Sequence, residues 1–395
     1  MRVSTFLADG TADDIVSRGG DHLGQTLGTP ALIAAFCSTA QPLGVVLDGL
    51  KARFPQAVVI GCSTAGEFSE LGDRKGHTSL WAISGDLRVH AGFGSGLARD
   101  PEATVMAATQ TLPVSIDGYP HRTAIILLDA LAGVSEETTL LVAGLLGSDV
   151  RLAGGAAGDD LQMKAPLVGL SGAGVGSDAV VVVTLHTRVA PGVGVSHGHR
   201  TVSGPLTVTK SSGAVVAEVD GRPAFDVWRE QTRTVARDRG IDVDALKDEQ
   251  IGAFLLQFEA GLAAGETIKI RAPLARGDDG SLSFACGIPE GSVVRITEGT
   301  EETQVASAVE AARRARAQMG PGRVAGALVF DCICRNLILK ERFKDAVAGM
   351  HDALGRVPLA GFESYGEVAL DVGDYSGFHN TTTVVLAFPA EDGDG

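Results

Sequence analysis

The stretch VVIGCSTAGE, residues 58–67, joins a short apolar run to a glycine-rich stop. Its first three residues predict a buried strand, and Gly61–Glu67 predicts the turn that ends it. Before it, apolar residues recur at helical spacing over residues 43–54. Further strands are predicted on either side, at Ala31–Phe36 and at Thr78–Ser84. The local pattern is therefore β-α-β-loop-β.

The same order of elements occurs twice more along the chain. The second copy comprises a strand at Thr123–Leu128, a helix from Ser135, a strand at Arg151–Ala153, the turn Gly154–Asp159 and a returning strand at Ala179–His186. The third comprises Val324–Phe330, a helix over 339–354, Val357–Leu359, the turn Gly361–Glu367 and Thr381–Phe388. The first and third turns share Gly-x-x-x-x-Gly-Glu, and the second has a shorter Gly-x-x-x-Gly-Asp. A single match would be weak, but its recurrence after the same elements predicts an internal repeat.

These repeats predict an α/β fold in which β-α-β-loop-β units form mixed sheets. The length of 395 residues favours two domains, and we place them at 1–225 and 226–395. Different short strands and helices are predicted between the second and third copies, and the polar stretch 232–250 is the expected junction. Whether the repeats share one sheet or form two stays open.

Glycine-rich turns at strand ends let the backbone approach a ligand closely, and their N–H groups can form an anion-binding nest. Since ligands bind at the carboxyl ends of parallel strands, we expect the turns to meet at a common cleft. The alternative is that all three are structural turns. The candidate ligand-binding residues are Gly61, Cys62, Ser63, Thr64, Gly66, Glu67, Gly155, Gly158, Asp159, Arg335, Gly361, Tyr365, Gly366 and Glu367.

Several of these side chains have a second interpretation. Glu67 and Glu367 can accept a ligand amine or cap nearby backbone N–H groups. Arg335 can clamp an anionic group or pair with Asp331. Cys62 or Ser63 would be the nucleophile of a hydrolase or transferase, but the surrounding sequence is not a G-x-S-x-G elbow and has no evident base. The sequence therefore favours a protein that is not an enzyme.

Composition narrows the class of protein. With 48 acidic and 33 basic residues the net charge is −15, which disfavours nucleic acid as a partner. The longest apolar run, Ala31–Cys37, is too short to span a bilayer, and residues 1–10 do not resemble a signal peptide. The five cysteines are an odd number, scattered rather than arranged as a disulfide framework. A cytoplasmic protein without membrane insertion is expected.

The motifs together resemble the FIST family of sensory proteins. The resemblance rests on Gly61–Glu67, Leu152–Asp159, Glu218–Ala224, Asp331–Arg335 and Gly361–Glu367 followed by His379–Thr382, in that order. It implies FIST N-like and FIST C-like parts and a ligand-sensing role, with small amino-acid-like ligands proposed for the family. One stand-alone branch is regarded as haem-binding nitric-oxide sensors that act on a partner histidine kinase or cyclic-di-GMP enzyme. The chain resembles that branch in architecture and in its Asp-Cys-Ile-Cys-Arg segment.

For a haem b cofactor, His379 is the first candidate axial ligand and Cys332 the weaker one. The competing interpretation of His379 is a histidine bonded to backbone groups at a strand start. His197 and His199 would share one face of a strand, and an exposed hairpin pair is expected there. Zinc is not expected, because Cys332 and Cys334 form C-x-C without a second pair. A metabolite sensor without haem and a purely structural interaction module remain alternatives.

Overall fold

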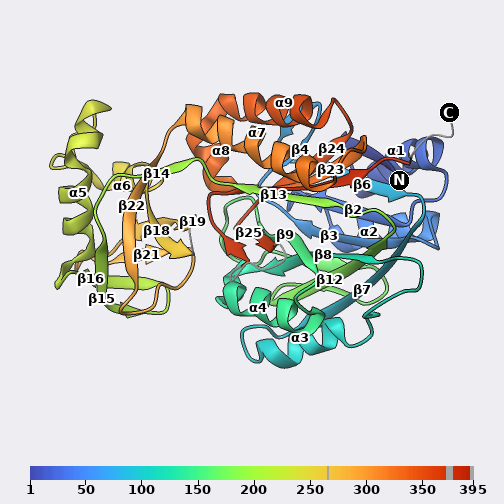
Figure 1. The fold of residues 1–395 in the computed structure, drawn as a ribbon, viewed down its shortest axis with the longest axis horizontal. Helices are drawn as coiled ribbons and strands as arrows, with labels where there is room; N and C mark the ends of the chain where they lie inside the picture. Colours follow the sequence, from blue (N-terminus) through green and yellow to red (C-terminus); the bar gives the residue numbers. More distant parts are fainter. Residues whose placement is uncertain (265–266, 371–376, 392–395) are drawn as a thin grey trace.

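A computed structural model describes residues 1–264, 267–370 and 377–391. Figure 1 shows a large lobe built from both ends of the chain and a smaller lobe built from its middle. The large lobe contains three units, and the small lobe, residues 199–299, is inserted into the third. We call the large lobe the core and the small lobe the insert.

Each unit begins with a strand and a helix that precede the predicted β-α-β-loop-β. The first unit comprises β1 (Arg2–Ala8), α1 (Ala12–Leu27), β2 (Leu32–Cys37), α2 (Leu43–Arg53), β3 (Val58–Ser63), β4 (Glu67–Ser69), β5 (Gly72–Arg74) and β6 (Thr78–Ser84). The second comprises β7 (Leu87–Ser95), α3 (Pro101–Thr109), β8 (His121–Asp129), the 3₁₀ turn η1 (Ala130–Ala132), α4 (Ser135–Leu146), β9 (Arg151–Ala157), β10 (Val168–Leu170), β11 (Gly174–Gly176) and β12 (Ala179–Thr187).

The third unit has the same order, interrupted after its first strand. It comprises β13 (Gly192–Ser196), then after the insert α7 (Glu301–Gln318), β23 (Val324–Cys332), α8 (Ile333–Leu339), η2 (Lys340–Arg342), α9 (Phe343–Leu354), β24 (Leu359–Ser364), β25 (Glu367–Leu370), β26 (Phe378–His379) and β27 (Thr383–Pro389). The predicted repeat was therefore too short by one strand and one helix per unit.

Each unit builds one six-stranded mixed sheet, in the orders β1-β6-β2-β3-β10-β11, β7-β12-β8-β9-β25-β26 and β13-β27-β23-β24-β4-β5. The two central strands are parallel in every case. The hairpin at the edge always comes from another unit: β10-β11 extends the first sheet, β25-β26 the second and β4-β5 the third. This cyclic exchange ties the three units together, and the repeats occupy three sheets instead of one or two.

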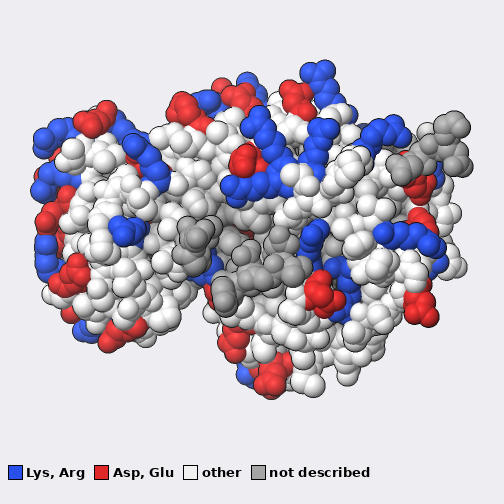
Figure 2. Space-filling model, in the orientation of Figure 1, with Lys and Arg blue, Asp and Glu red and all other residues white. Residues whose placement is uncertain are grey.

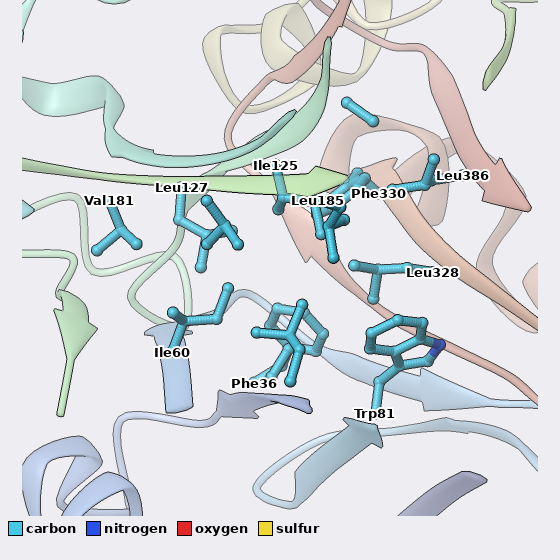
Figure 3. Packing of buried hydrophobic residues seen from close by; sticks show 14 of the residues in the cluster. Phe36, Ile60, Trp81, Ile125, Leu127, Val181, Leu185, Leu328, Phe330 and Leu386 are labelled. Carbon is cyan, nitrogen blue, oxygen red and sulfur yellow. The ribbon is translucent and has the colours of Figure 1, made fainter. Parts of the chain in front are cut away.

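The inner faces of the three sheets share one apolar core. Figure 3 shows Phe36 and Trp81 of the first sheet, Leu127 of the second and Phe330 and Leu386 of the third converging on it. Phe36 stacks on Phe362 with ring centroids 4.7 Å apart. Helices cover the outer faces, which explains why the core strands read as almost unbroken apolar runs.

Strands β7 and β13 each carry a Gly-x-Gly pair that allows the strand to pack closely against a helix. A Cβ at Gly92 or Gly94 of β7 would lie about 2 Å from carbonyl oxygens of α3, at 2.0 and 2.1 Å. At Gly192 and Gly194 of β13 the corresponding distances to α7 are 1.8 and 1.9 Å. These contacts identify α7 as the counterpart of α3, although 100 or so residues separate it from β13.

The insert has its own sheet, its own apolar cluster and two helices. It comprises β14 (His199–Thr201), β15 (Leu206–Ser212), β16 (Val215–Val219), β17 (Arg222–Pro223), α5 (Ala224–Asp238), α6 (Asp248–Leu255), β18 (Phe258–Ala264), β19 (Thr267–Arg271), β20 (Pro273–Arg276), β21 (Leu282–Phe284) and β22 (Val293–Gly299). Trp228 of α5 lies in its core and donates from its indole nitrogen to the Phe258 carbonyl, at 2.8 Å. The stretch 232–250, predicted as a junction, lies within this lobe.

Candidate functional site

The three glycine-rich turns do meet, and we call residues 63–67, 156–160 and 363–367 the hub. Every pair of turns is joined by backbone hydrogen bonds. Between the first and third turns, Ala65 N donates to Glu363 O (3.0 Å) and Glu363 N to Gly66 O (2.8 Å). Between the first and second, Gly158 N donates to Ser63 O and Asp160 N to Thr64 O (both 2.9 Å). Between the second and third, Ala156 N donates to Gly366 O (2.7 Å) and Tyr365 N to Ala156 O (3.1 Å). The donors expected to form an anion-binding nest are thus bonded to the neighbouring turns.

The glycines of the hub allow this close approach of backbone to backbone. A Cβ on Gly158 would lie 2.6 Å from the Ala65 nitrogen and 2.8 Å from the Thr64 carbonyl carbon. Gly366 has φ of +145°, a conformation that side chains rarely adopt. Gly61 and Gly361 lie in the strands before the turns, where a Cβ would meet a carbonyl of the adjacent strand at 2.2 and 2.0 Å. These glycines serve packing within the core.

The three acids at the ends of the turns cap backbone donors. Glu67 accepts from the Thr64 hydroxyl and from the His77 N–H, at 3.1 Å for the latter. Glu367 accepts from the Ser364 hydroxyl at 2.6 Å and from the Thr382 N–H at 3.1 Å. Burial raises the pKa of Glu67 to about 8 and that of Glu367 well above its usual value. In this structure Glu67 and Glu367 therefore cap backbone N–H groups, which is the second of their two interpretations.

Asp159 differs from the other two acids in the charge it carries. Burial works against its ionised form, but the Tyr365 hydroxyl and the backbone N–H groups of residues 163–165 donate to it and hold its pKa below the usual value. The Tyr365 hydroxyl lies 2.6 Å from Asp159 Oδ1. The second turn is therefore pinned to the third by a charge-assisted hydrogen bond.

The remaining hub candidates are also held by the protein itself. The Ser63 hydroxyl donates to the Gly158 carbonyl at 2.6 Å and accepts from the Leu167 N–H at 2.7 Å. Cys62 is buried in the central apolar cluster, and burial raises its thiol pKa well above the ordinary value. Gly155 packs against Phe362 and Phe330. A thiol and a hydroxyl in these settings lack the activation that a nucleophile needs.

Arg335 is fully buried and pairs within the protein instead of clamping an anion. Its Nε donates to Asp331 Oδ1 at 2.7 Å, one Nη donates to the Ser307 hydroxyl at 2.9 Å, and the other donates to the Gln304 carbonyl at 2.7 Å. Asp331 also accepts from the Thr383 hydroxyl at 2.9 Å. The structure thus contains the Arg335–Asp331 ion pair, which the sequence analysis gave as the alternative to anion binding.

His199 is buried and His197 is half-buried, so the expected exposed hairpin pair is not found. The ring of His199 is buried, and its Nε2 is 3.5 Å from Glu259 Oε2. Burial lowers the pKa of His199 to about 3 and that of His197 to about 4, and raises that of Glu259 to about 8. His197 and His199 lie where the chain passes from β13 of the core to β14 of the insert. Packing between the two lobes buries them, which a local hairpin pattern could not predict.

His379 fits the backbone-bonded interpretation in this structure. Its Nε2 is 3.2 Å from the Ala369 carbonyl, and burial lowers its pKa to about 3. Cys332 is 2 % exposed, and burial raises its thiol pKa well above the usual value, which disfavours a thiolate ligand. The residues as arranged do not fit a haem: His379 lies outside the cavity that Cys332 lines, and its outer nitrogen is already bonded.

A cavity of about 210 Å³ lies where the insert meets the hub, and we call it the seam cavity. Its apolar wall combines Leu256 and Leu274 of the insert, Leu161 and Met163 of the second turn's loop, and Ile333 and Leu337 of α8. Its polar wall has Cys332, Cys334, Tyr365 and Asn380. Figure 2 shows the surface hollowed between the two lobes. Of the predicted site residues, Tyr365 and Cys332 line this cavity.

The seam continues on both sides of this cavity. A cleft of about 810 Å³ lies between the start of α4 and the insert, and it shares Ala285 with the seam cavity. Another, of about 520 Å³, lies between α8 and the insert and shares Leu256 and Leu337. Sequence reasoning missed this region because its walls come from segments far apart in the chain. The Cys-x-Cys was one available signal, but it was weighed as a metal site, and Asn380 was considered only as part of the motif His379–Thr382.

Two further searches of the structure bear on the class of site. In the ranges that the structure describes, no three or more His, Cys, Asp and Glu side chains are grouped as metal ligands. Over the same ranges no helix is long and apolar enough to cross a membrane. On the face seen in Figure 2 acidic and basic side chains are interspersed.

The chain is similar to several uncharacterised proteins. One from Mycobacterium tuberculosis H37Rv is 29% identical over 209 residues, which cover 49% of this chain and 50% of that protein. One from Methanocaldococcus jannaschii is 25% identical over 345 residues, covering 82% of this chain and 64% of that protein. The chain thus spans about half the length of the mycobacterial relatives. A crystal structure of cyanuric acid hydrolase from A. caulinodans aligns over 98% of this chain and 99% of its own at 8% identity, with a TM-score of 0.32, too low to support any inference.

Two family models together match most of the chain. The FIST N model matches residues 31–222 and the FIST C model matches residues 224–370. The boundary between them, like the one we predicted after residue 225, falls inside the insert, so the sequence domains and the structural lobes differ. The chain therefore belongs to the FIST family, with a FIST N domain followed by a FIST C domain.

Proposed function

We propose that this protein is a sensory protein whose small ligand binds in the seam cavity and changes how the insert sits on the core. The observation that supports this is the composition of the cavity wall, which comes from both lobes. A ligand there contacts Leu256 of the insert and Ile333 of the core at once. Ligand sites occur preferentially at such junctions, and a ligand biases an equilibrium only through different contacts in its two states.

One short segment connects the cavity to both the insert and the hub. Asn380 lines the cavity. The next residue, Thr381, donates its hydroxyl to Glu259 Oε1 of the insert at 2.8 Å and has φ of +48°. The N–H of Thr382 donates to Glu367 of the hub at 3.1 Å. A shift of Asn380 on ligand binding would therefore act on a strained residue that holds the insert.

The proposal is tested by thermal unfolding of the full chain against a panel of metabolites. A ligand that binds only the folded state raises stability by RT ln(1 + [L]/Kd), or about 2.7 kcal/mol at a hundredfold excess over Kd. Leu256→Trp fills the cavity and should abolish the shift. Leu145→Trp, at a half-exposed leucine of α4 away from the cavity, is the matched control and should retain it. A shift that survives Leu256→Trp would place the ligand elsewhere.

The output is proposed to pass to a partner protein, a histidine kinase or a cyclic-di-GMP enzyme, as the family resemblance implies. The haem-dependent version, a nitric-oxide sensor, rests on that resemblance alone. Protein expressed with a haem supply would show a Soret band that is weakened or shifted in His379→Ala. Colourless protein that takes up no haem on titration would exclude this version and leave the seam proposal standing.

Absence of enzymatic activity also stays a prediction. Broad esterase and thiol-reactive probes should label neither Cys62 nor Ser63 in the folded protein. Labelling of either residue that is lost when the residue is replaced by alanine would support the hydrolase or transferase alternative.

A further inference from the structure

The wall of the seam cavity sets strict limits on the charge of its ligand. Among the described residues that line it, none is acidic, basic or histidine. The ionisable groups behind the wall are bonded within the protein: Arg335 pairs with Asp331, Glu259 accepts from Thr381, and Asp159 accepts from the wall residue Tyr365. An ionised group held against this wall would lose part of its hydration without gaining a charged partner among the lining residues.

Most of the hydrogen-bonding capacity of the wall is already used. The Tyr365 hydroxyl donates its proton to Asp159 Oδ1 at 2.6 Å, which leaves its oxygen able to accept. Asn380 donates to the His379 carbonyl at 3.1 Å and accepts from the Ala272 N–H at 3.4 Å. The wall therefore offers acceptor lone pairs on Asn380 Oδ1 and on the Tyr365 oxygen, which the backbone N–H groups of Asp159 and Leu161 also face, and little else beyond weak thiols.

The size and the sulfur content of the wall narrow the ligand further. The volume of about 210 Å³ accommodates a small molecule, and Ala285, Leu256 and Leu337 continue the wall into the two neighbouring clefts. Three sulfur atoms, of Cys332, Cys334 and Met163, lie in the same wall as the Tyr365 ring. Sulfur atoms make favourable contacts with ring edges, and aromatic rings pack on one another.

We infer that the seam cavity takes a small uncharged aromatic molecule with a single N–H or O–H donor, directed at the side-chain oxygen of Asn380 or Tyr365. This inference rests on the proposed function and narrows its ligand class. It differs from the amino-acid-like ligand expected from the sequence, whose ammonium and carboxylate groups would both lack partners in this wall. Indole, with one ring system and one N–H, is a probe of this class.

The experiment compares probes that share the ring system and differ in charge. Indole, tryptamine and indole-3-acetate are titrated into the full chain, followed by calorimetry and thermal unfolding. Indole should bind, and the two charged analogues should bind about 100-fold more weakly, because unpaired buried charge is costly. 1-Methylindole, which lacks the donor, should bind about tenfold more weakly than indole.

Blocking variants separate failure of this inference from failure of the site. Leu256→Trp, and Leu274→Trp as a second variant at a more exposed position, should abolish indole binding, and Leu145→Trp should not. If a charged analogue binds as tightly as indole and is blocked by both variants, the ligand class is wrong and the site stands. If neither indole nor any panel compound binds in a manner that these variants block, the proposed site is wrong as well.

Discussion

The hub and the seam cavity are neighbours that share Tyr365, yet they treat polar groups in opposite ways. In the hub, most backbone N–H groups, hydroxyls and carboxylates are bonded, with Glu363 Oε2 as a buried exception, and the glycines leave little space between the turns. In the seam cavity the wall is mostly apolar, and its few polar side chains, such as Tyr365 and Asn380, keep only part of their hydrogen-bonding capacity. Buried polar groups are stable only when they are paired, so the hub is structural.

The difference suggests where to look for a ligand site in a protein built from repeats. The recurring motif assembles the core, because each turn locks the other two. The cavity appears where the repetition breaks: the insert interrupts the third unit, and Tyr365 stands where the first turn has Ala65. Departures from the repeat are therefore better indicators of the site than the repeat itself.

The largest expected effect comes from breaking the buried ion pair beside the hub. Arg335→Met leaves Asp331 buried, with Thr383 as its remaining donor among those described here. Removing one partner of a buried pair costs about 3–5 kcal/mol, and urea unfolding should show a loss of that size. Arg342→Met removes exposed pairs with Glu301 and Glu302 and should cost less than about 1 kcal/mol. Equal losses in the two variants would contradict the assignment of Arg335 to a structural network.

A smaller effect is expected from adding one methyl group to the hub. Gly158→Ala places its Cβ against the backbone of Ala65 and Thr64, and overpacking of this kind costs about 1–3 kcal/mol. The control is Gly144→Ala in α4, where an added Cβ meets no described heavy atom within 4 Å. That change should stabilise the helix by up to about 1 kcal/mol. A tolerated Gly158→Ala would mean that the turns can separate, which a ligand-binding hub requires.

The contrast between hub and cavity also explains which features could be predicted from the sequence. Strands such as Val324–Cys332 are buried on both faces, so their apolar runs and the glycine-rich stops were visible, as was the repeat. The first strand and helix of each unit were not recognised as part of the repeat. The Gly-x-Gly of β7 and β13 was a signal for them, but it is meaningful only once a helix is known to pack there.

The site was harder to predict for a physical reason. Cyclic exchange of hairpins and the position of the insert are set by contacts between segments more than 100 residues apart, such as Tyr365 with Asp159. Residue type alone did not separate a glycine that approaches a ligand from one that approaches another backbone. Glu67 and Glu367 were likewise compatible with a ligand amine or with a cap until their donors were known.

The last effect, the smallest when counted over a single pH unit, is expected from neutralising an acid of the hub. Burial raises the pKa of Glu67 to about 8, against about 4.3 in an unfolded chain. Between these values the folded state holds a proton that the unfolded state has lost. The stability that protonated Glu67 contributes is therefore complete below about pH 4 and is lost as pH rises towards 8.

Glu67→Gln mimics the protonated acid at every pH, so it should flatten the decline in stability between about pH 4 and 8. The slope removed is at most about 1.4 kcal/mol per pH unit, the limit for one proton. Urea unfolding at a series of pH values measures it. Glu102→Gln, on the surface of α3, should leave the slope unchanged, because that side chain is in water in both states. If Glu67→Gln left the slope intact, Glu67 would be ionised in the folded protein, and the hub would hold a charge free to attract a cationic ligand.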